Sequence, residues 1–391
     1  MSDVIQKNGR FYTHETFSRL LISNINIKNP LSIVDLGVGE GALYTAAIKK
    51  WENANFYLAD NDKRKLNNLI KLYPNYNYFH FDLFSKKFID FIDKYGTSFE
   101  VGICNPPFLS IRSNKYIKEI FYRSNLEKTF QKSPLTSYLV FLAGNLLLLK
   151  KQGQLGIILP DSMLTRCDYK AFREDLLNNY DIKTIIELPD KIFSKTEAKT
   201  HILIIESDNN CSTEIGVVSS NLIGNLSEPI MINKNKLIDR MDYSYHSFFS
   251  NKTSSDLVSF KDLGVEIIRG RQSKIELENQ RIKFFHTTNF KKKILTLINS
   301  KVKATPQTRK GDVLIARVGK RSIGKVALVH SGNQVISDCV FILRVKSKNR
   351  RIIWKYLNSI EGYKSLKALS HGVCSKVISK QHLYALRIKL P

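Results

Sequence analysis

The chain has 391 residues, enough for two or three domains of ordinary size, and its five cysteines show no CxxC spacing, which argues against a zinc site or a disulfide framework. No apolar run approaches the ~18 residues of a transmembrane helix, and the N-terminus lacks a signal-peptide profile. The formal net charge of +26 is large for this length and favours a polyanionic partner. We therefore expect a cytoplasmic protein with no metal site and no membrane association.

The positive charge is concentrated in the C-terminal part of the chain. Residues 251–391 contain 30 Lys and Arg against 8 Asp and Glu, a net charge of +22, whereas the first 250 residues carry only +4. A codon-usage bias would affect both parts equally. The asymmetry therefore predicts a near-neutral catalytic domain joined to a basic domain that binds a polyanion.

A glycine-rich turn follows the first predicted strand. Residues 31–36 form an apolar run with Asp35 near its end, and Gly37, Gly39 and Gly41 then occupy alternate positions before a helical pattern. Glycine permits positive φ and lets the backbone approach a ligand closely, as in the strand-to-helix turn of a doubly wound nucleotide site. By itself such a turn is a weak indication of function.

The second predicted strand, 55–59, ends at Asp60. This residue lies 25 positions after the acidic residue of the first strand, close to the ~20-residue offset at which a carboxylate meets a ribose diol. Asp62 is the competing candidate, although its place beyond the strand favours a solvated role. The third predicted strand, 76–81, runs into Asp82-Leu83.

A rigid loop, Asn105-Pro106-Pro107-Phe108, follows the fourth predicted strand. The two prolines prevent a strand or helix from continuing, and proline restricts the preceding residue to extended conformations. The Asn105 amide oxygen, a proline carbonyl and the flat face of Phe108 suit a planar ring that carries an exocyclic amine. Four successive strands thus end in polar or glycine-rich groups, at the sheet edge where open α/β sheets bind ligands.

These motifs resemble a known family. Residues 35–41, Asp-Leu-Gly-Val-Gly-Glu-Gly, look like the cofactor loop of class I S-adenosylmethionine-dependent methyltransferases, although the dinucleotide spacing G-x-G-x-x-G is absent. Asn-Pro-Pro-Phe looks like the catalytic tetrapeptide of their amino-methylating DNA enzymes. The motif order and the long C-terminal extension are similar to the gamma class of adenine-N6 methyltransferases. Phe11-Tyr12-Thr13 resembles the segment that closes over the cofactor, with His14 where that class usually has proline.

The resemblance continues to residue 193. Residues 135–160 and 172–193 match later segments of the family, and Phe193 resembles the aromatic that packs on the other face of the extruded base. Pro189-Asp190 with Glu197-Ala198-Lys199 superficially spells the PD…ExK pattern of restriction nucleases. We discount a nuclease, because the methyltransferase order already explains these positions and no separate core of ~100 residues remains.

The last part of the chain resembles a DNA-recognition domain. Residues 209–255 are polar and predict a linker or an edge region. Short β-like runs follow at 265–269, 312–318, 325–330 and 340–345. Residues 311–317 resemble the target-recognition domains of type I specificity subunits. Because Arg reads guanine and Gln reads adenine in the major groove, the candidate base readers are Arg269, Arg271, Gln272, Lys320 and Arg321.

The resemblance implies an α/β fold: a mostly parallel, Rossmann-like methyltransferase sheet in residues 1–208, and a smaller mixed α/β DNA-recognition domain in residues 256–391. It implies transfer of a methyl group from S-adenosylmethionine to N6 of a flipped-out adenine in double-stranded DNA, as the modification part of a restriction-modification system. A restriction endonuclease acting on the same site is an implied partner, and we expect a nucleoid-associated monomer. The implied catalytic residues are Asn105, Pro106, Pro107, Phe108 and Phe193, and the implied cofactor-binding residues are Thr13, Asp35, Gly37, Gly39, Asp60, Asp82 and Leu83.

Two alternatives remain at this point. The same tetrapeptide occurs in methyltransferases that act on RNA or on protein glutamine, because any planar amide or amine fits its geometry. The other alternative is a DNA-specificity protein with a degenerate methyltransferase head. The basic C-terminal domain argues against a protein substrate, and the intact motifs argue against degeneracy.

Overall fold

The computed structural model describes residues 15–190, 199–208, 212–249, 257–300, 306–372 and 375–389. The chain divides into two compact units, Met1–His246 and Ser247–Pro391. The described part of the predicted linker or edge region therefore belongs mainly to the first unit, up to His246. No helix in the described ranges is long and apolar enough to cross a membrane.

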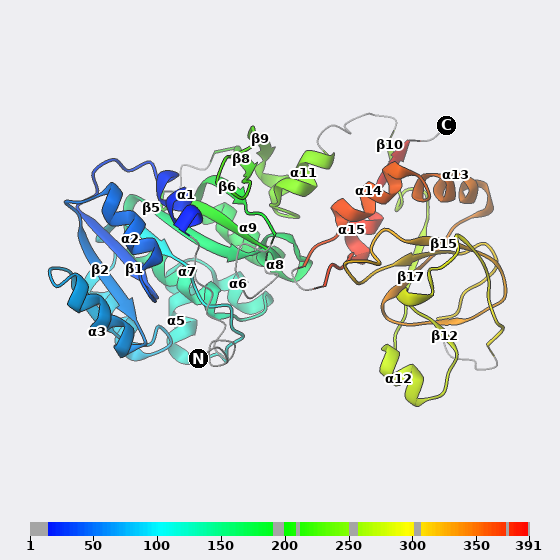
Figure 1. Cartoon of the computed structure of the whole chain (residues 1–391), viewed down its shortest axis with the longest axis horizontal. Coiled ribbons are helices and arrows are strands. Elements are labelled where there is room, and N and C mark those ends of the chain that lie inside the picture. The colour runs from blue at the N-terminus through cyan, green and yellow to red at the C-terminus, as the bar shows by residue number, and fades with distance from the viewer. Residues whose placement is uncertain are drawn as a thin grey trace. The chain divides into compact units, whose positions relative to one another are not determined.

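The described residues of the first unit form a nine-stranded sheet in the order β3-β2-β1-β4-β5-β7-β6-β8-β9. Figure 1 labels several of these strands and the helices around them. The strands are β1 (Ser32–Leu36), β2 (Asn55–Asp60), β3 (Asn77–His80), β4 (Phe99–Cys104), β5 (Leu149–Pro160), β6 (Asp181–Glu187), β7 (Thr200–Glu206), β8 (Glu214–Ser219) and β9 (Ile230–Asn233). The helices are α1 (Glu15–Ser23), α2 (Ala42–Lys50), α3 (Lys63–Leu72), α4 (Lys86–Tyr95), α5 (Lys115–Arg123), α6 (Glu127–Lys132), α7 (Ser137–Leu148), α8 (Asp161–Thr165), α9 (Lys170–Asn179), α10 (Lys234–Leu237) and α11 (Tyr243–Phe249), with a 3-10 turn at Cys167–Tyr169.

The sheet is mostly parallel. Strands β3, β2, β1, β4 and β5 run in one direction, and β7 is inserted antiparallel between β5 and β6. Strand β8 is parallel to β6, and β9 closes the edge as an antiparallel strand. The carboxyl ends of β1 to β6 therefore lie on one edge of the sheet, together with the start of β7.

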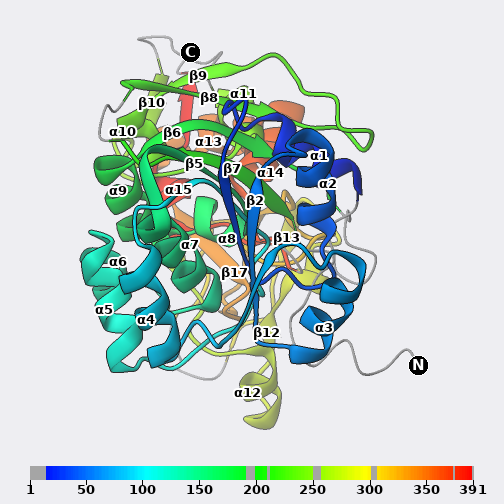
Figure 2. The ribbon, with the colours of Figure 1, turned by 90° about the vertical axis from the view of Figure 1, so that its left-hand side faces the viewer.

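Helices cover both faces of this sheet (Figure 2), with α1, α2 and α3 on one side and α4, α5 and α7 on the other. The central strands contain apolar runs where both faces are buried, as in residues 155–159 of β5 and 202–205 of β7. In β1, for example, Val34 and Leu36 pack in one core and Ile33 in the other. Helix α7 is apolar on nearly all sides and almost completely buried, although Gly144 and Asn145 interrupt its run of Leu, Val, Phe and Ala.

The second unit is a smaller mixed α/β structure. Its five-stranded sheet has the order β11-β17-β14-β15-β13 within the described ranges, and two further strand pairs, β10-β18 and β12-β16, accompany it. The strands are β10 (Leu257–Ser259), β11 (Glu266–Arg269), β12 (Phe284–Phe285), β13 (Ile294–Thr296), β14 (Val313–Ala316), β15 (Val326–Ser331), β16 (Val335–Ile336), β17 (Val340–Arg344) and β18 (Arg387–Lys389). The helices are α12 (Lys274–Asn279), α13 (Ser347–Leu357), α14 (Ile360–Leu369) and α15 (Lys380–Tyr384), with a 3-10 turn at Thr287–Asn289.

Candidate active site

The predicted catalytic and cofactor residues that the structure describes come from one edge of the first sheet. The Gly37 loop follows β1, Asp60 ends β2, Asp82 lies just beyond β3, and Asn105 follows β4. Because these strands are parallel, their carboxyl ends converge on that edge. Thr13 and Phe193 lie outside the described residues.

The loop between β1 and α2 requires glycine. Gly37, Gly39 and Gly41 have φ values of 80°, 58° and 85°, in the left-handed region that side chains disfavour. Gly37 is also crowded, since a Cβ atom there would lie 2.8 Å from Cε1 of Phe141 in α7. The alternating glycines thus let the backbone turn tightly at the end of β1 while resting on a buried helix.

Asp60 holds this loop in place. Its Oδ2 accepts a hydrogen bond of 2.8 Å from the N–H of Gly39, and its Oδ1 accepts one of 2.8 Å from the N–H of Asp62. Asp62 instead caps α3, where its Oδ1 accepts from the N–H of Arg64 at 3.1 Å. Of the two candidate carboxylates, Asp60 is therefore the one bonded to the glycine loop.

In the Asp82-Leu83 segment, one side chain faces solvent and the other lies in the core. Asp82 is exposed and accepts a hydrogen bond of 2.9 Å from the N–H of Phe84, whereas Leu83 is buried against α4 and α7. Only Asp82 presents a polar side chain at the surface. A contact of Leu83 with a ligand would have to come from its backbone.

The Asn105-Pro106-Pro107-Phe108 loop is fastened to the start of α7. The hydroxyl of Ser137 donates to the carbonyl of Pro107 and accepts a hydrogen bond of 3.0 Å from the N–H of Leu109. The ring of Phe108 meets Tyr138 edge-on, with 5.8 Å between the ring centroids. The loop is therefore held by contacts with Ser137 and Tyr138 that its own sequence does not predict.

A buried carboxyl lies under the glycine loop. Asp35 is 1% exposed, and its Oδ1 accepts no hydrogen bond from the described residues. Burial, with a smaller contribution from the negative charge of Asp60, raises the pKa of the Asp35 carboxyl well above its usual value. Burial and the proximity of Asp35 also raise the pKa of the Cys104 thiol at the end of β4. The floor of the site is therefore poorly solvated.

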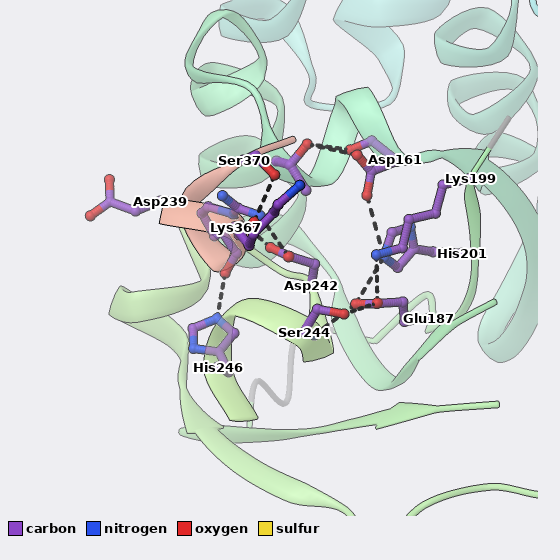
Figure 3. A network of polar contacts seen from close by, with 12 residues as sticks. Asp161, Glu187, Lys199, His201, Asp239, Asp242, Ser244, His246, Lys367 and Ser370 are labelled. Atoms are coloured by element: carbon purple, nitrogen blue, oxygen red, sulfur yellow. Dashed lines mark hydrogen bonds and ion pairs between the residues drawn. The ribbon is translucent and has the colours of Figure 1, made fainter. Parts of the chain in front are cut away.

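A second polar network lies where β5, β6 and β7 meet this edge (Figure 3). Lys199 Nζ lies 2.5 Å from Glu187 Oε1, and the ring of His201 lies within 4.0 Å of carboxylate oxygens of both Glu187 and Asp161. Glu187 also accepts a hydrogen bond of 2.8 Å from the N–H of Ser244. The side chains of Lys199 and Glu187 are only 12% and 6% exposed, so this ion pair is largely shielded from water.

The pairing decides the charge states of this network. Burial alone would raise the pKa of the Glu187 carboxyl, but the contacts with His201 and Lys199 outweigh it and hold the pKa well below its usual value. Burial acts to lower the pKa of Lys199, and the negative charge of Glu187 outweighs this and raises it. Both groups are therefore charged at neutral pH.

Sequence reasoning missed this network. From the sequence, Lys199 was singled out only as part of a nuclease-like pattern, whereas in the structure it pairs with Glu187. The available indication was the position of Glu187 and His201 at the ends of the apolar runs 185–186 and 202–205, because charged groups are rarely buried without a partner. Adjacent to it, Arg240 and Asp242 form a buried bidentate pair at 2.7 and 2.6 Å.

The candidate base readers fall in two turns of the second unit. Arg269 ends β11 and contacts Asp338, and Gln272 donates a hydrogen bond of 2.9 Å to Gln280. Arg271, Lys320 and Arg321 are exposed. Strand β17 pairs with both β11 and β14, placing the turns after these two strands at the same end of the sheet.

A family model and related proteins match this chain. The model of the family described as N-6 DNA Methylase matches residues 2–264, more than half of the chain. The type II methyltransferase M.BsuBI of Bacillus subtilis is 24% identical over 213 residues, which cover 48% of this chain and 41% of that protein. The chain thus spans about two fifths of the length of this curated relative.

Solved structures are also similar. The type IIG restriction endonuclease BpuSI matches with a TM-score of 0.50 and 14% identity, over 96% of this chain and 57% of that chain. A type I methyltransferase subunit from Streptococcus thermophilus matches with a TM-score of 0.46 and 20% identity, over 64% of this chain and 55% of that chain. At 14% identity the likeness to BpuSI concerns the fold alone.

Proposed function

The chain belongs to the N-6 DNA Methylase family, and from this premise we propose that it transfers a methyl group from S-adenosylmethionine to N6 of adenine at specific sites in double-stranded DNA. It does so as the modification enzyme of a restriction-modification system, alongside a restriction endonuclease that acts on the same site. The first unit carries out catalysis. The second unit, with most of the positive charge, binds the DNA.

The observation that carries this proposal is the placement of Asn105-Pro106-Pro107-Phe108. The loop follows β4, which pairs with β1, so it lies next to the β1 loop. Helix α7 contacts both loops: Ser137 bonds to the tetrapeptide, and Phe141, one turn later, packs against Gly37. The tetrapeptide and the β1 loop are therefore both held by the same buried helix. This arrangement suits a reaction between two bound molecules.

The residues of the β1 and β2 ends fit the cofactor. Gly37, Gly39 and Gly41 leave room where side chains would intrude, and the carboxylate of Asp60 suits a ribose diol. Asp35 would shape the floor of the pocket, and Asp82 would accept a hydrogen bond from the amino group of the cofactor's own adenine. When bound, S-adenosylmethionine supplies an electrophilic methyl group on a sulfonium centre.

The tetrapeptide prepares the amino nitrogen of the target base. The N6 lone pair of adenine is delocalised into the ring and is a poor nucleophile. Asn105 Oδ1 and the Pro106 carbonyl each accept one N6 hydrogen, which shifts the nitrogen toward tetrahedral geometry and orients its lone pair. The gain is one of orientation and electrostatics, and it needs no titrating base. As the methyl group would move from sulfur to N6, the sulfonium would become a neutral thioether and N6 would release one proton to solvent. Because N6 is inaccessible in a stacked duplex, the adenine is flipped out, and Phe108 packs against it.

Methylation of purified DNA tests the proposal. The full chain is incubated with duplex DNA and S-adenosylmethionine, and the nucleosides are identified by mass spectrometry. We expect N6-methyladenine, and Asn105→Ala should lower the rate by about 100-fold or more while DNA and cofactor binding remain. Asn55→Ala, at the opposite end of β2, is the matched control and should remain active. N4-methylcytosine, or methylation of RNA or protein alone, would overturn the proposal.

A further inference from the structure

Two arginines of the second unit share one acceptor. The Nε atoms of Arg317 and Arg269 donate to the backbone carbonyl of Asp338, at 2.8 and 3.3 Å. The sheet register explains the meeting, because Arg269 pairs with Phe341 across β11 and β17, and Ala316 pairs with Val340 across β14 and β17. Residues far apart in the sequence thus meet at the start of β17.

Arg317 is held more firmly than the exposed basic residues around it. It is half-buried, its own N–H donates a hydrogen bond of 2.9 Å to the carbonyl of Cys339, and its guanidinium lies 5.9 Å from the ring centroid of Phe341. Its Nε is used by Asp338, whereas its two terminal nitrogens make no hydrogen bond with the described residues. The side chain therefore presents two parallel donors from a fixed position.

The charge at this end of the sheet is not balanced. The Asp338 carboxylate lies 3.5 Å from the guanidinium of Arg269, and the guanidinium of Arg317 is close to the same residue. The same turns also expose three further basic side chains, Arg271, Lys320 and Arg321. Burial and, secondarily, the nearby charge of Arg269 lower the pKa of Arg317. An electron-rich ligand that accepts two hydrogen bonds would relieve this excess.

Rigidity separates base readers from phosphate binders. A long exposed side chain loses rotamer freedom when it binds, and it contacts phosphates wherever they lie. A guanidinium that is already oriented loses less, and its planar fork matches the O6 and N7 acceptors of guanine. Arg317 meets this description better than the five candidates chosen from sequence.

We propose that Arg317 is a specificity-determining residue that reads a guanine of the target sequence through its terminal nitrogens. The inference rests on the proposed function, since it takes double-stranded DNA as the substrate. The backbone of Asp338 orients Arg317, and Arg271, Lys320 and Arg321 bind phosphates around it.

Methylation of a library of randomised duplexes tests this inference with the full chain. Wild-type protein should methylate a motif that contains a guanine, and Arg317→Ala should lower discrimination at that position by about 10- to 100-fold while leaving the other positions selective. Arg317→Lys keeps the positive charge but not the planar fork, so it should show the same relaxation with little loss of DNA affinity.

Arg321→Ala is the comparison variant. It should weaken binding to all sequences alike and reduce the salt dependence by about one phosphate contact, with the motif unchanged. Thermal melting separates a folding defect from a change in selectivity, and Arg317→Lys serves if Arg317→Ala does not fold. Methylation by both Arg317 variants with the wild-type motif would overturn the inference. Absence of methylation by wild-type protein would instead refute the proposed function.

Discussion

The backbone N–H of Gly39 donates a hydrogen bond of 2.8 Å to Oδ2 of Asp60, which joins the β1 loop to the end of β2. Asp60→Asn puts an amide in place of this carboxylate, so one oxygen acceptor and the negative charge are lost. We expect S-adenosylmethionine affinity to fall by about 10- to 100-fold, as for a charge-assisted hydrogen bond, measured by calorimetric titration. Asp62→Asn, which retains a good helix cap, should have little effect. A larger loss of S-adenosylmethionine affinity for Asp62→Asn than for Asp60→Asn would show that Asp62, not Asp60, binds the ribose.

Ser137 should matter for turnover rather than for binding. Ser137→Ala removes the donor to Pro107 and the acceptor for Leu109, which loosens the attachment of the tetrapeptide to α7. Because small misplacements of reacting groups are costly, we expect single-turnover methylation to slow by about 10-fold or more with DNA affinity unchanged. Ser137→Thr retains the hydroxyl and should recover most of the rate. Equal rates for Ser137→Ala and wild type would show that this anchor is dispensable.

The buried pair Lys199–Glu187 should contribute strongly to stability. Lys199→Met leaves the Glu187 carboxylate buried without its lysine, which typically costs about 3–5 kcal/mol in the free energy of unfolding, as denaturant titration would measure. The double variant Lys199→Met with Glu187→Gln removes both charges and should recover part of the loss. Lys49→Met breaks an exposed pair with Glu15 and should cost no more than about 0.5 kcal/mol. Similar costs for both lysines would contradict the shielding inferred for Lys199.

Asp35 predicts a pH-dependent stability. Its pKa is raised in the folded state, so the folded protein holds this proton more tightly than the unfolded chain, and stability falls as pH rises through and above the unfolded value. Asp35→Asn should therefore be more stable than wild type at pH 8, by about 1.4 kcal/mol for each unit of pKa shift. The difference should shrink as pH falls toward about 4, where the unfolded carboxyl is protonated as well.

Thermal melting across this pH range, without cofactor, measures the effect. Asp90→Asn on the exposed face of α4 is the control and should melt like wild type throughout. A stability difference for Asp35→Asn that grew toward low pH would have the wrong sign.

The elements that local patterns specify were predictable. Glycines at alternate positions and prolines after an apolar run have few structural solutions, so the β1 loop and the tetrapeptide could be placed from sequence. The sequence also favoured Asp60 over Asp62, and Asp60 accepts a hydrogen bond from Gly39 in the glycine loop. The resemblance to adenine-N6 methyltransferases led to the family that the comparisons confirm.

Contacts that depend on chain topology could not be predicted. Lys199 meets Glu187 because β7 is inserted antiparallel beside β6, an order that no local pattern encodes. Arg317 stands out among many basic residues only when β14 and β11 are seen to flank β17. Composition identifies a basic domain, whereas the choice of one arginine requires the positions of its neighbours.

Helix α7 connects the tetrapeptide with the β1 loop, the two loops that we propose hold the reactants. Ser137 bonds to the tetrapeptide. Phe141, four residues further along the same buried helix, packs against Gly37 in the β1 loop. Four residues correspond to about 6 Å of helix axis and roughly one turn. One residue inserted between them would rotate the later contact by about 100° and advance it by about 1.5 Å. In the proposed reaction, such an insertion would put the methyl donor and the acceptor out of register even though neither loop had changed, so the length of α7 itself would limit the rate.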